Sequence, residues 1–211
     1  SFLLIDMKTP GIEVKPIITI DGSHEVNMVY FVDVVVPYEN LVGEEGQGWN
    51  IAKFLLMHER TGIAGLSSIK RELKRLKELA SATNSDDSTL LDDQNFLAKL
   101  NKVEIELTAT QFTELRTLSA ISNGGSPGPE SSILKVKGTE LQQKVTELFI
   151  EMLGYYAHPF LRESELGSNE SIGPDYAPSA MPNYLNFRKV SIYGGSNEIQ
   201  RNVIAKAILE L

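Results

Sequence analysis

The sequence has no cysteine among its 211 residues, which excludes disulfides, cysteine metal ligands and thiol nucleophiles. Positive charge is in the minority: 28 acidic residues outnumber 20 Lys and Arg, and the net charge of −8 argues against binding to nucleic-acid phosphates. No stretch approaches the roughly 18 successive apolar residues of a membrane span, and we expect no signal peptide at the start. These absences are typical of a bacterial cytoplasmic protein.

The residues that are present predict a folded core and two regions. Apolar residues make up 42% of the chain and charged residues 23%, which excludes a disordered chain. Residues 1–45 contain runs rich in β-branched side chains, which predict antiparallel strands at Phe2–Asp6, Ile12–Ile20 and Val26–Val36. A strand that opens the chain without an earlier partner indicates a fragment of a longer protein.

Residues 46–211 show the spacing of amphipathic helices. Apolar residues recur three and four positions apart in four sets: Ile69, Leu73, Leu76 and Ala80; Phe96, Leu100, Val103 and Leu107; Leu141, Val145, Leu148 and Met152; and Ile199, Val203 and Ala207. Polar or Pro/Gly-rich breaks are predicted at Asn84–Asp93, Asn123–Pro129 and His158–Pro182. The predicted fold is therefore mainly α, a partial β domain followed by an up-and-down helical bundle.

Most candidate sites have an ordinary structural interpretation. The three His are scattered, so no metal site is predicted, and neither a nucleophile elbow nor a phosphate-binding loop is found. One helix carries five basic residues with Glu72 and Glu78 between them: Lys70, Arg71, Lys74, Arg75 and Lys77. We interpret this run as a solvated face with local ion pairs, and a polyphosphate site is the alternative.

Glu59 lies among apolar and small residues, with Gly62 and Gly65 about one turn further along. A carboxylate in a desolvated cavity has a raised pKa and becomes a better proton acceptor for a weak carbon acid. The periodicity alone favours the other interpretation, a surface glutamate paired with a cation.

The segment Ile192–Arg201 combines two glycines with a good helix cap. Gly194 and Gly195 allow a ligand to approach the backbone closely, and Ser196 is a favourable N-cap that directs the N–H groups of the next helix toward an anion. An ordinary glycine turn before a capped helix is the alternative.

Taken together, these segments resemble the C-terminal half of the acyl-CoA dehydrogenase family. Tyr193–Arg201 is similar to the family's motif near its C-terminus, with Arg188 at the position of an Arg that precedes it. Val35–Gly43 followed by Gly46–Trp49 is similar to the stretch that joins the middle β domain to the last helical domain. The resemblance spans the whole chain and implies a β-domain remnant at 1–45 and a bundle at 46–211.

The resemblance implies an activity and a catalytic residue. In this family a carboxylate removes the α proton of an acyl-CoA, while a hydride leaves the β carbon for the flavin and a trans-2-enoyl-CoA forms. The commonest position for the base corresponds to Gly194, which cannot act. A subgroup carries its base in a Glu-Arg pair on the first helix of the C-terminal domain, which matches Glu59-Arg60. Glu59 is therefore the expected base.

The resemblance also implies binding residues. Arg60, Gly194 and Gly195 are expected on the substrate side. Four residues are expected to contact FAD: Ser196, Glu198, Glu151 and Gly154. The Glu151–Tyr155 stretch keeps only one glycine of the family's Gln-x-x-Gly-Gly segment, and the Arg-x-x-Phe-Gly motif is missing.

Partners follow from the same resemblance. They are an acyl-CoA substrate of dicarboxyl or other bulky type, electron-transfer flavoprotein or a similar acceptor, and further subunits in a homo- or hetero-oligomer such as a tetramer. Two alternatives stay open: a non-catalytic subunit of a hetero-oligomeric dehydrogenase, and an acyl-CoA oxidase that passes electrons to oxygen.

Overall fold

The computed structural model describes residues 1–82, 84–85, 88–125, 128–161 and 172–210, and the side chains of residues 57–63 and 84–85 lie outside that description. The chain forms two compact units, Ser1–Glu59 and Arg60–Leu211. The division between these compact units lies within helix α1 (Gly48–Ile63), and the domain boundary at residue 45 stays a prediction.

The start of α1 belongs to the first unit because it packs on the N-terminal segment. A side chain on Gly48 would collide with the carbonyl group of Ser1, and one on Gly43 would press on the end of Ile51. The residue pattern changes from strand-like to helical where secondary structure changes, and the first compact unit continues beyond that point into α1.

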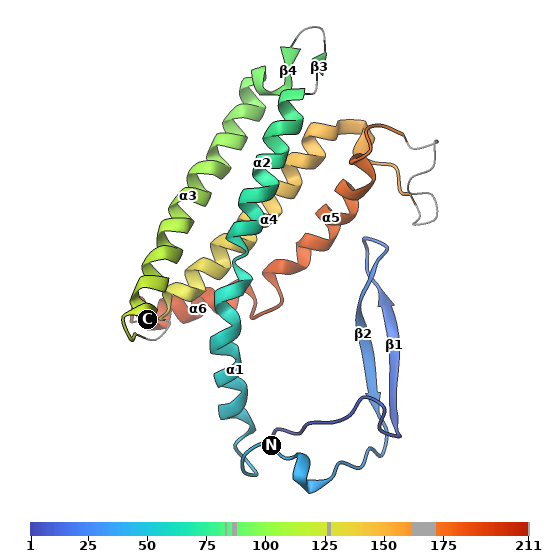
Figure 1. Ribbon diagram of the computed structural model, residues 1–211, viewed down its shortest axis with the longest axis vertical. Helices are drawn as coiled ribbons and strands as arrows, with labels where there is room; N and C mark the ends of the chain where they lie inside the picture. The colour runs from blue at the N-terminus through green and yellow to red at the C-terminus, as the bar shows by residue number, and fades with distance from the viewer. Residues whose placement is uncertain (83, 86–87, 126–127, 162–171, 211) are drawn as a thin grey trace. The chain divides into compact units, whose positions relative to one another are not determined.

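The first unit contains a two-stranded antiparallel sheet, β1 (Ile12–Ile18) and β2 (His24–Phe31) (Figure 1). The strand predicted to reach Val36 ends at Phe31, because Phe31 pairs with the first residue of β1 and Asp33 has a φ of 50°. The strand predicted at Phe2–Asp6 is also wrong: only Leu3 forms a bridge there, with Leu41. The antiparallel orientation is confirmed.

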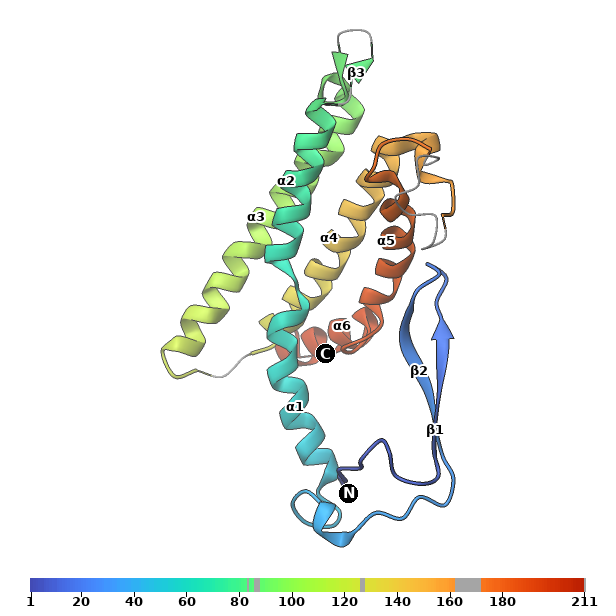
Figure 2. The same ribbon diagram turned by 45° about the vertical axis from the view of Figure 1, so that its right-hand side comes forward.

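The second unit is a helical bundle. After the last residues of α1 it contains α2 (Leu66–Ala82), α3 (Gln94–Ser122), α4 (Glu130–Leu153), α5 (Ala180–Asn186) and α6 (Asn197–Ile208). The short strands β3 (Asn84–Ser85) and β4 (Ser88–Thr89) pair between α2 and α3. Helices α2, α3 and α4 lie side by side in both views, as the mainly α prediction requires (Figures 1 and 2).

The predicted apolar stripes form the core of this unit. Leu76, Leu100 and Leu141, one from each long helix, have no exposed surface. Burial of such side chains stabilises the bundle by roughly 1.5–3 kcal/mol each. Within the described helices, none is long and apolar enough to cross a membrane.

Helix ends follow local chemistry. Asp93 caps α3 by accepting from the N–H groups of Asn95 and Phe96. Helix α5 begins at Ala180, inside the segment predicted to be irregular up to Pro182. The reason is that Pro182 lies in the first turn, where its missing N–H has no helical partner.

The short interruption between helices α1 and α2 contacts α4. Gly65 has a φ of 60°, which interrupts the helix, and the Gln142 side chain donates to the Ala64 carbonyl over 3.0 Å. The backbones touch here, since a side chain on Gly138 would collide with Ala64. This contact fixes where α2 begins.

Candidate functional site

The terminal glycine loop, Tyr193–Ser196, connects the end of the α5 region to α6. Gly194 and Gly195 have φ angles of 65° and 83°, which are left-handed conformations that favour glycine. Within the described part of the chain, the backbone N–H groups of Gly194, Gly195 and Ser196 have no hydrogen-bond acceptor. The loop therefore presents three backbone N–H donors for which no acceptor lies among the described residues.

Ser196 caps α6, as predicted, with its hydroxyl oxygen accepting from the Ile199 N–H at 3.4 Å. Glu198, in the first turn, has a pKa below its usual value, chiefly because it accepts from its own backbone N–H and then from the Ser196 hydroxyl. The Ile199 N–H is therefore occupied by the Ser196 hydroxyl, and the predicted role of this helix end toward an anion stays a prediction.

Arg188 anchors the segment before the loop to α4. Its guanidinium donates to the Glu147 carboxylate at 2.8 Å, the Thr146 hydroxyl at 2.9 Å and the Gln143 carbonyl at 3.1 Å, and it lies 4.3 Å from the Tyr184 ring centroid. Paired donors of this kind orient a guanidinium firmly. Arg188 therefore fixes the position at which the glycine loop starts.

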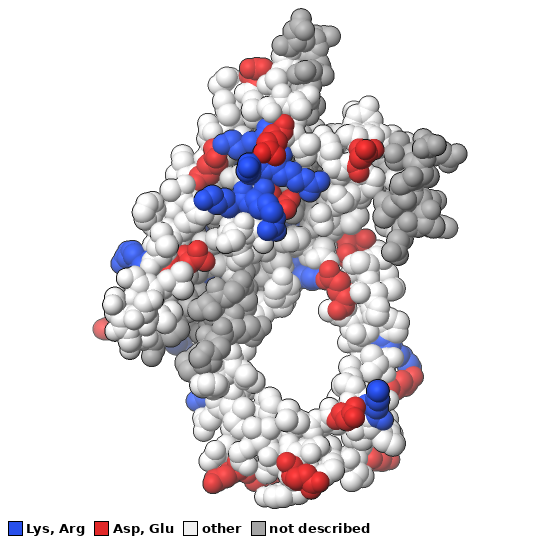
Figure 3. All heavy atoms as spheres, viewed as in Figure 1, with Lys and Arg blue, Asp and Glu red and all other residues white. Residues whose placement is uncertain are grey.

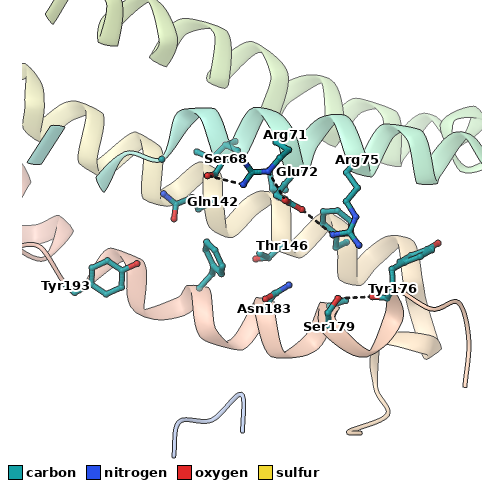
Figure 4. Close-up of a pocket in the computed structure, with 16 residues that line it drawn as sticks. Ser68, Arg71, Glu72, Arg75, Gln142, Thr146, Tyr176, Ser179, Asn183 and Tyr193 are labelled. Atoms are coloured by element: carbon teal, nitrogen blue, oxygen red, sulfur yellow. Dashed lines mark hydrogen bonds and ion pairs between the residues drawn. The ribbon is translucent and has the colours of Figure 1, made fainter. Parts of the chain in front are cut away.

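A pocket of about 520 Å³ lies between α2, α4 and α5 and includes Tyr193 in its wall. In Figure 4, α2 contributes Ser68, Arg71, Glu72 and Arg75 on one side, and α5 contributes Asn183 opposite them. The sequence motifs do not predict this pocket, because its walls come from helices that are far apart in the sequence.

The charge in this pocket is unbalanced. Arg71 and Arg75 both approach the Glu72 carboxylate at 3.6 Å, so two guanidinium groups share one carboxylate among the described lining residues. The Arg71 guanidinium also donates to the Ser68 hydroxyl at 3.3 Å. The pocket thus has an excess of donors and one net positive charge beside apolar walls such as Phe149.

The other basic residues of α2 form a solvated face, as predicted. Figure 3 shows Lys and Arg gathered over α2 with acidic residues between them. Lys74 pairs with Glu78 at 3.7 Å with both side chains mostly exposed, and Lys77 reaches Glu104 of α3 at 2.7 Å. Exposed pairs of this kind contribute little to stability.

The expected base, Glu59, and its neighbour Arg60 lie on the helical backbone of α1, and their side chains lie outside the described residues. The helix predicted after the glycine joint is confirmed. The role of Glu59 and the substrate-side role of Arg60 stay predictions.

The four residues expected to contact FAD form two separate groups. Glu151 and Gly154 lie at the C-terminal end of α4, and Ser196 and Glu198 lie beside its N-terminal half. Lys135 contacts α6, and Glu151 lies sixteen positions further along α4. At the rise of an α-helix, the distance between these two positions is about 24 Å. Within this chain, one edge of a flavin can therefore contact one of the two groups but not both.

The local chemistry of the two groups differs. The Glu151 carboxylate accepts from Lys99 of α3 at 2.6 Å, and Gly154 ends α4 with a φ of 52°. The unpaired N–H groups of the glycine loop suit carbonyl oxygens of a flat heteroaromatic ring or a thioester. The glycine loop therefore fits a flavin better than the Glu151 end does.

A third set of polar residues is not predicted by the sequence motifs. Lys135, Asn197 and Gln200 are almost completely buried where α4 meets α6. A detectable pattern was present for one of them, because Lys135 stands between Leu134 and Val136 on a helix side that is otherwise apolar or small.

Comparison with known proteins gives a consistent result. The family model described as "Acyl-CoA dehydrogenase, C-terminal domain" matches residues 46–209. Acyl-CoA dehydrogenase IpdE1 of Mycobacterium tuberculosis (strain ATCC 25618 / H37Rv) is 30% identical over 216 residues, which include 100% of this chain and 50% of that protein. The chain spans about half the length of the curated relatives it matches first.

Two solved structures share the fold. The ChsE4-ChsE5 complex from Mycobacterium tuberculosis matches with a TM-score of 0.79 and 27% identity, over 99% of this chain and 52% of that one. A structure described as PigA with FAD and proline matches with a TM-score of 0.76 and 20% identity, over 97% and 50% of the two chains. At that identity the second match is evidence for the fold alone.

Proposed function

The chain belongs to the acyl-CoA dehydrogenase family, and from this premise we propose that it is the C-terminal half of a flavin-dependent enzyme that converts an acyl-CoA thioester into the trans-2-enoyl-CoA. The observation that carries the proposal is the glycine loop. It has unpaired N–H donors, no side chain at Gly194 or Gly195, and a pocket of about 520 Å³ beside Tyr193.

Glu59 is the proposed base. Gly194 occupies the position from which most family members supply a carboxylate, so the acid must come from another segment. Glu59-Arg60 on α1 matches the pair that one subgroup uses for this purpose. In a desolvated site the Glu59 carboxylate would take the α proton of the thioester.

The glycine loop would stabilise the charge that develops as this proton leaves. Backbone N–H groups that point at the thioester oxygen lower the energy of an enolate without reorganisation, and the N–H groups of Gly194 and Gly195 are available for this. Arg188 supports the geometry, because it holds the preceding segment on α4.

FAD is the proposed cofactor, held at the Ser196 and Glu198 end of the loop in one subunit and at the Glu151 and Gly154 end in another subunit. When bound, the flavin accepts the hydride from the β carbon of the acyl group. Splitting the contacts between subunits accounts for the two separate groups, one at the C-terminal end of α4 and one at the start of α6. The exposed apolar side chains of Ile105, Phe112 and Leu115 on one side of α3 support assembly with another subunit.

The pocket supports a proposal for the substrate class. Its volume suits a bulky acyl group, since ligand pockets are typically ~300–1,000 Å³. Arg71 and Arg75 exceed the charge of Glu72, which favours a carboxylate or carbonyl at the far end of that group. We therefore propose a dicarboxyl or similarly polar, bulky acyl-CoA, handled in the bacterial cytoplasm with electron-transfer flavoprotein or a similar acceptor.

The Glu59→Gln variant of the full-length protein tests the proposal. Under anaerobic conditions, we expect adipoyl-CoA to bleach the wild-type flavin faster than hexanoyl-CoA does. The variant should bleach at least about 100-fold more slowly with either substrate, because the base is lost. Glu45→Gln, on the exposed joint before α1, is the matched control. Near-normal bleaching by Glu59→Gln would contradict the assignment.

A second candidate is a non-catalytic subunit of a hetero-oligomeric dehydrogenase. The ion pair between Glu151 and Lys99 favours it, because it engages a carboxylate expected at the cofactor. A purified full-length chain without flavin absorbance, alone or with a partner subunit, would support this alternative. Peroxide release in air, without an electron carrier, would instead support the oxidase.

A further inference from the structure

Five polar side chains are buried between the first half of α4 and the start of α6. We call them the α4–α6 polar cluster: Ser132, Lys135, Thr139, Asn197 and Gln200. Lys135, Thr139 and Ser132 have no exposed surface, and Gln200 and Asn197 are 1% and 4% exposed. The proposed dehydrogenation assigns no role to any of them.

Lys135 is the unusual member, because lysine is almost never completely buried. Its ammonium group donates to the Asn197 side-chain oxygen at 2.9 Å. Burial lowers its pKa, because the charged form loses its hydration, and the Glu198 carboxylate offsets part of this effect. A buried cation adds little net stability even when paired, so stability alone does not account for Lys135.

Two sets of hydrogen bonds, joined by the first turn of α6, connect Lys135 with the glycine loop. Asn197, the first residue of α6, accepts from Lys135, and its amide nitrogen donates to the Thr139 hydroxyl at 3.1 Å. One turn later, the Gln200 amide nitrogen donates to the carbonyls of Gly194 and Gly195, each at 3.4 Å. The first turn of α6 is therefore attached to α4 on one side and to the loop on the other.

The orientation of both amides is determined by their partners. Lysine can only donate, so the Asn197 oxygen must face Lys135. Backbone carbonyls can only accept, so the Gln200 nitrogen must face the loop, and this leaves its buried oxygen without a partner in the described structure. The cluster thus retains an unpaired buried acceptor in order to hold the loop carbonyls.

The loop needs such a restraint. Two consecutive glycines in left-handed conformations lose more conformational entropy on ordering than any other residue pair would. Gln200 also lies so close that a side chain on Gly195 would collide with it. Contact with Gln200 therefore selects one loop conformation.

We propose that Lys135 is a positioning residue, which acts through Asn197 and Gln200 to hold the glycine loop in the conformation that its ligand needs. The identity of that ligand rests on the proposed function, whereas the positioning itself does not.

Amide hydrogen exchange of this chain without ligand tests the proposal. In Lys135→Met, which keeps the length of the side chain and removes its charge and donors, we expect amides of residues 194–200 to exchange about tenfold faster. Amides of α2 and α3 should change less than about twofold. Lys137→Met is the matched control, because Lys137 is exposed two residues away and its ion pair is with Glu140, outside the α4–α6 polar cluster.

A second variant keeps the test decisive if Lys135→Met does not fold. Asn197→Asp places a carboxylate against Lys135, and the Thr139 hydroxyl, 3.2 Å from that oxygen, can donate to it. We expect loop exchange to slow about threefold. Unchanged loop exchange in either variant, or an equal increase in α2 and α3, would overturn the proposal. Because no flavin or CoA is present, failure of the Glu59 test leaves this result unaffected.

Discussion

The two sets of positive charge in the helical unit differ in number and in burial. Helix α2 carries five cations, and on its solvated face Lys74 and Glu78 are 78% and 65% exposed. Helix α4 carries three, and one of them, Lys135, is completely buried against α6. A run of charged residues is conspicuous in a sequence. The comparison teaches that such a run constrains the structure less than one cation inside a core does.

Solvent explains the difference. Water hydrates and screens the cations of α2, so an exposed ion pair has nearly the same free energy as the two separately hydrated charges. At the α4–α6 polar cluster no water replaces a lost partner, so an unmade hydrogen bond costs the full desolvation penalty of the group left behind. Predictions can separate these two environments by changing one group in each.

The largest effect on stability is expected from Thr139→Val, which keeps the shape of a buried side chain but removes the hydroxyl that Asn197 contacts. We expect the free energy of unfolding in urea to fall by about 2 kcal/mol. Thr108→Val is the matched control, since Thr108 also donates to a carbonyl four residues earlier but is exposed, and it should change stability by less than about 0.5 kcal/mol. Equal losses would remove the distinction between the two environments.

An intermediate effect is expected from Glu106→Gln, which breaks the partly buried pair with Lys144 at 2.8 Å. The hydrogen bond from Lys144 lowers the pKa of Glu106 below its ordinary value of 4.5. The stabilisation is therefore complete above that value and is lost as the pH falls through the folded pKa.

Urea unfolding at two pH values measures this effect. The variant should be less stable than wild type by about 0.5–1 kcal/mol at neutral pH, and the difference should vanish in acid. Glu114→Gln on the same helix is the control, because Glu114 has no ion pair among the described residues. A difference that persists in acid would show that packing rather than charge is responsible.

The smallest effect is expected from Lys74→Ala on the solvated face of α2. The Lys74–Glu78 pair is 3.7 Å long and exposed, so stability should change by less than about 0.5 kcal/mol and the change should shrink further in salt. Thermal unfolding at low and high salt measures this. A loss as large as that of Thr139→Val would contradict the comparison.

The sequence predicted the helices well because their core positions repeat. Leu73, Leu76 and Leu141 are buried where the spacing of apolar residues placed them, and Ser196 caps α6 as its residue type suggested. Strand ends were predicted poorly. Val26–Val36 contains suitable side chains throughout, but its pairing stops where β1 has no further residue to offer.

The candidate site also has parts that the sequence predicted and parts that it did not. Local motifs predicted the left-handed glycine loop, because a close backbone approach needs glycine at particular positions, whereas the role of Glu59-Arg60 stays a prediction. The α2–α4–α5 pocket and the link from Lys135 to Gln200 could not be found this way, because each joins helices that are distant in the sequence.

By itself, the sequence determined the family, the helical periodicity and the glycines that let the loop turn, since all of these depend on residue type and local spacing. Only the tertiary structure decided which polar side chains lose their water. Burial depends on what the rest of the chain brings against a residue, and it is burial that separates Lys135 from the cations of α2.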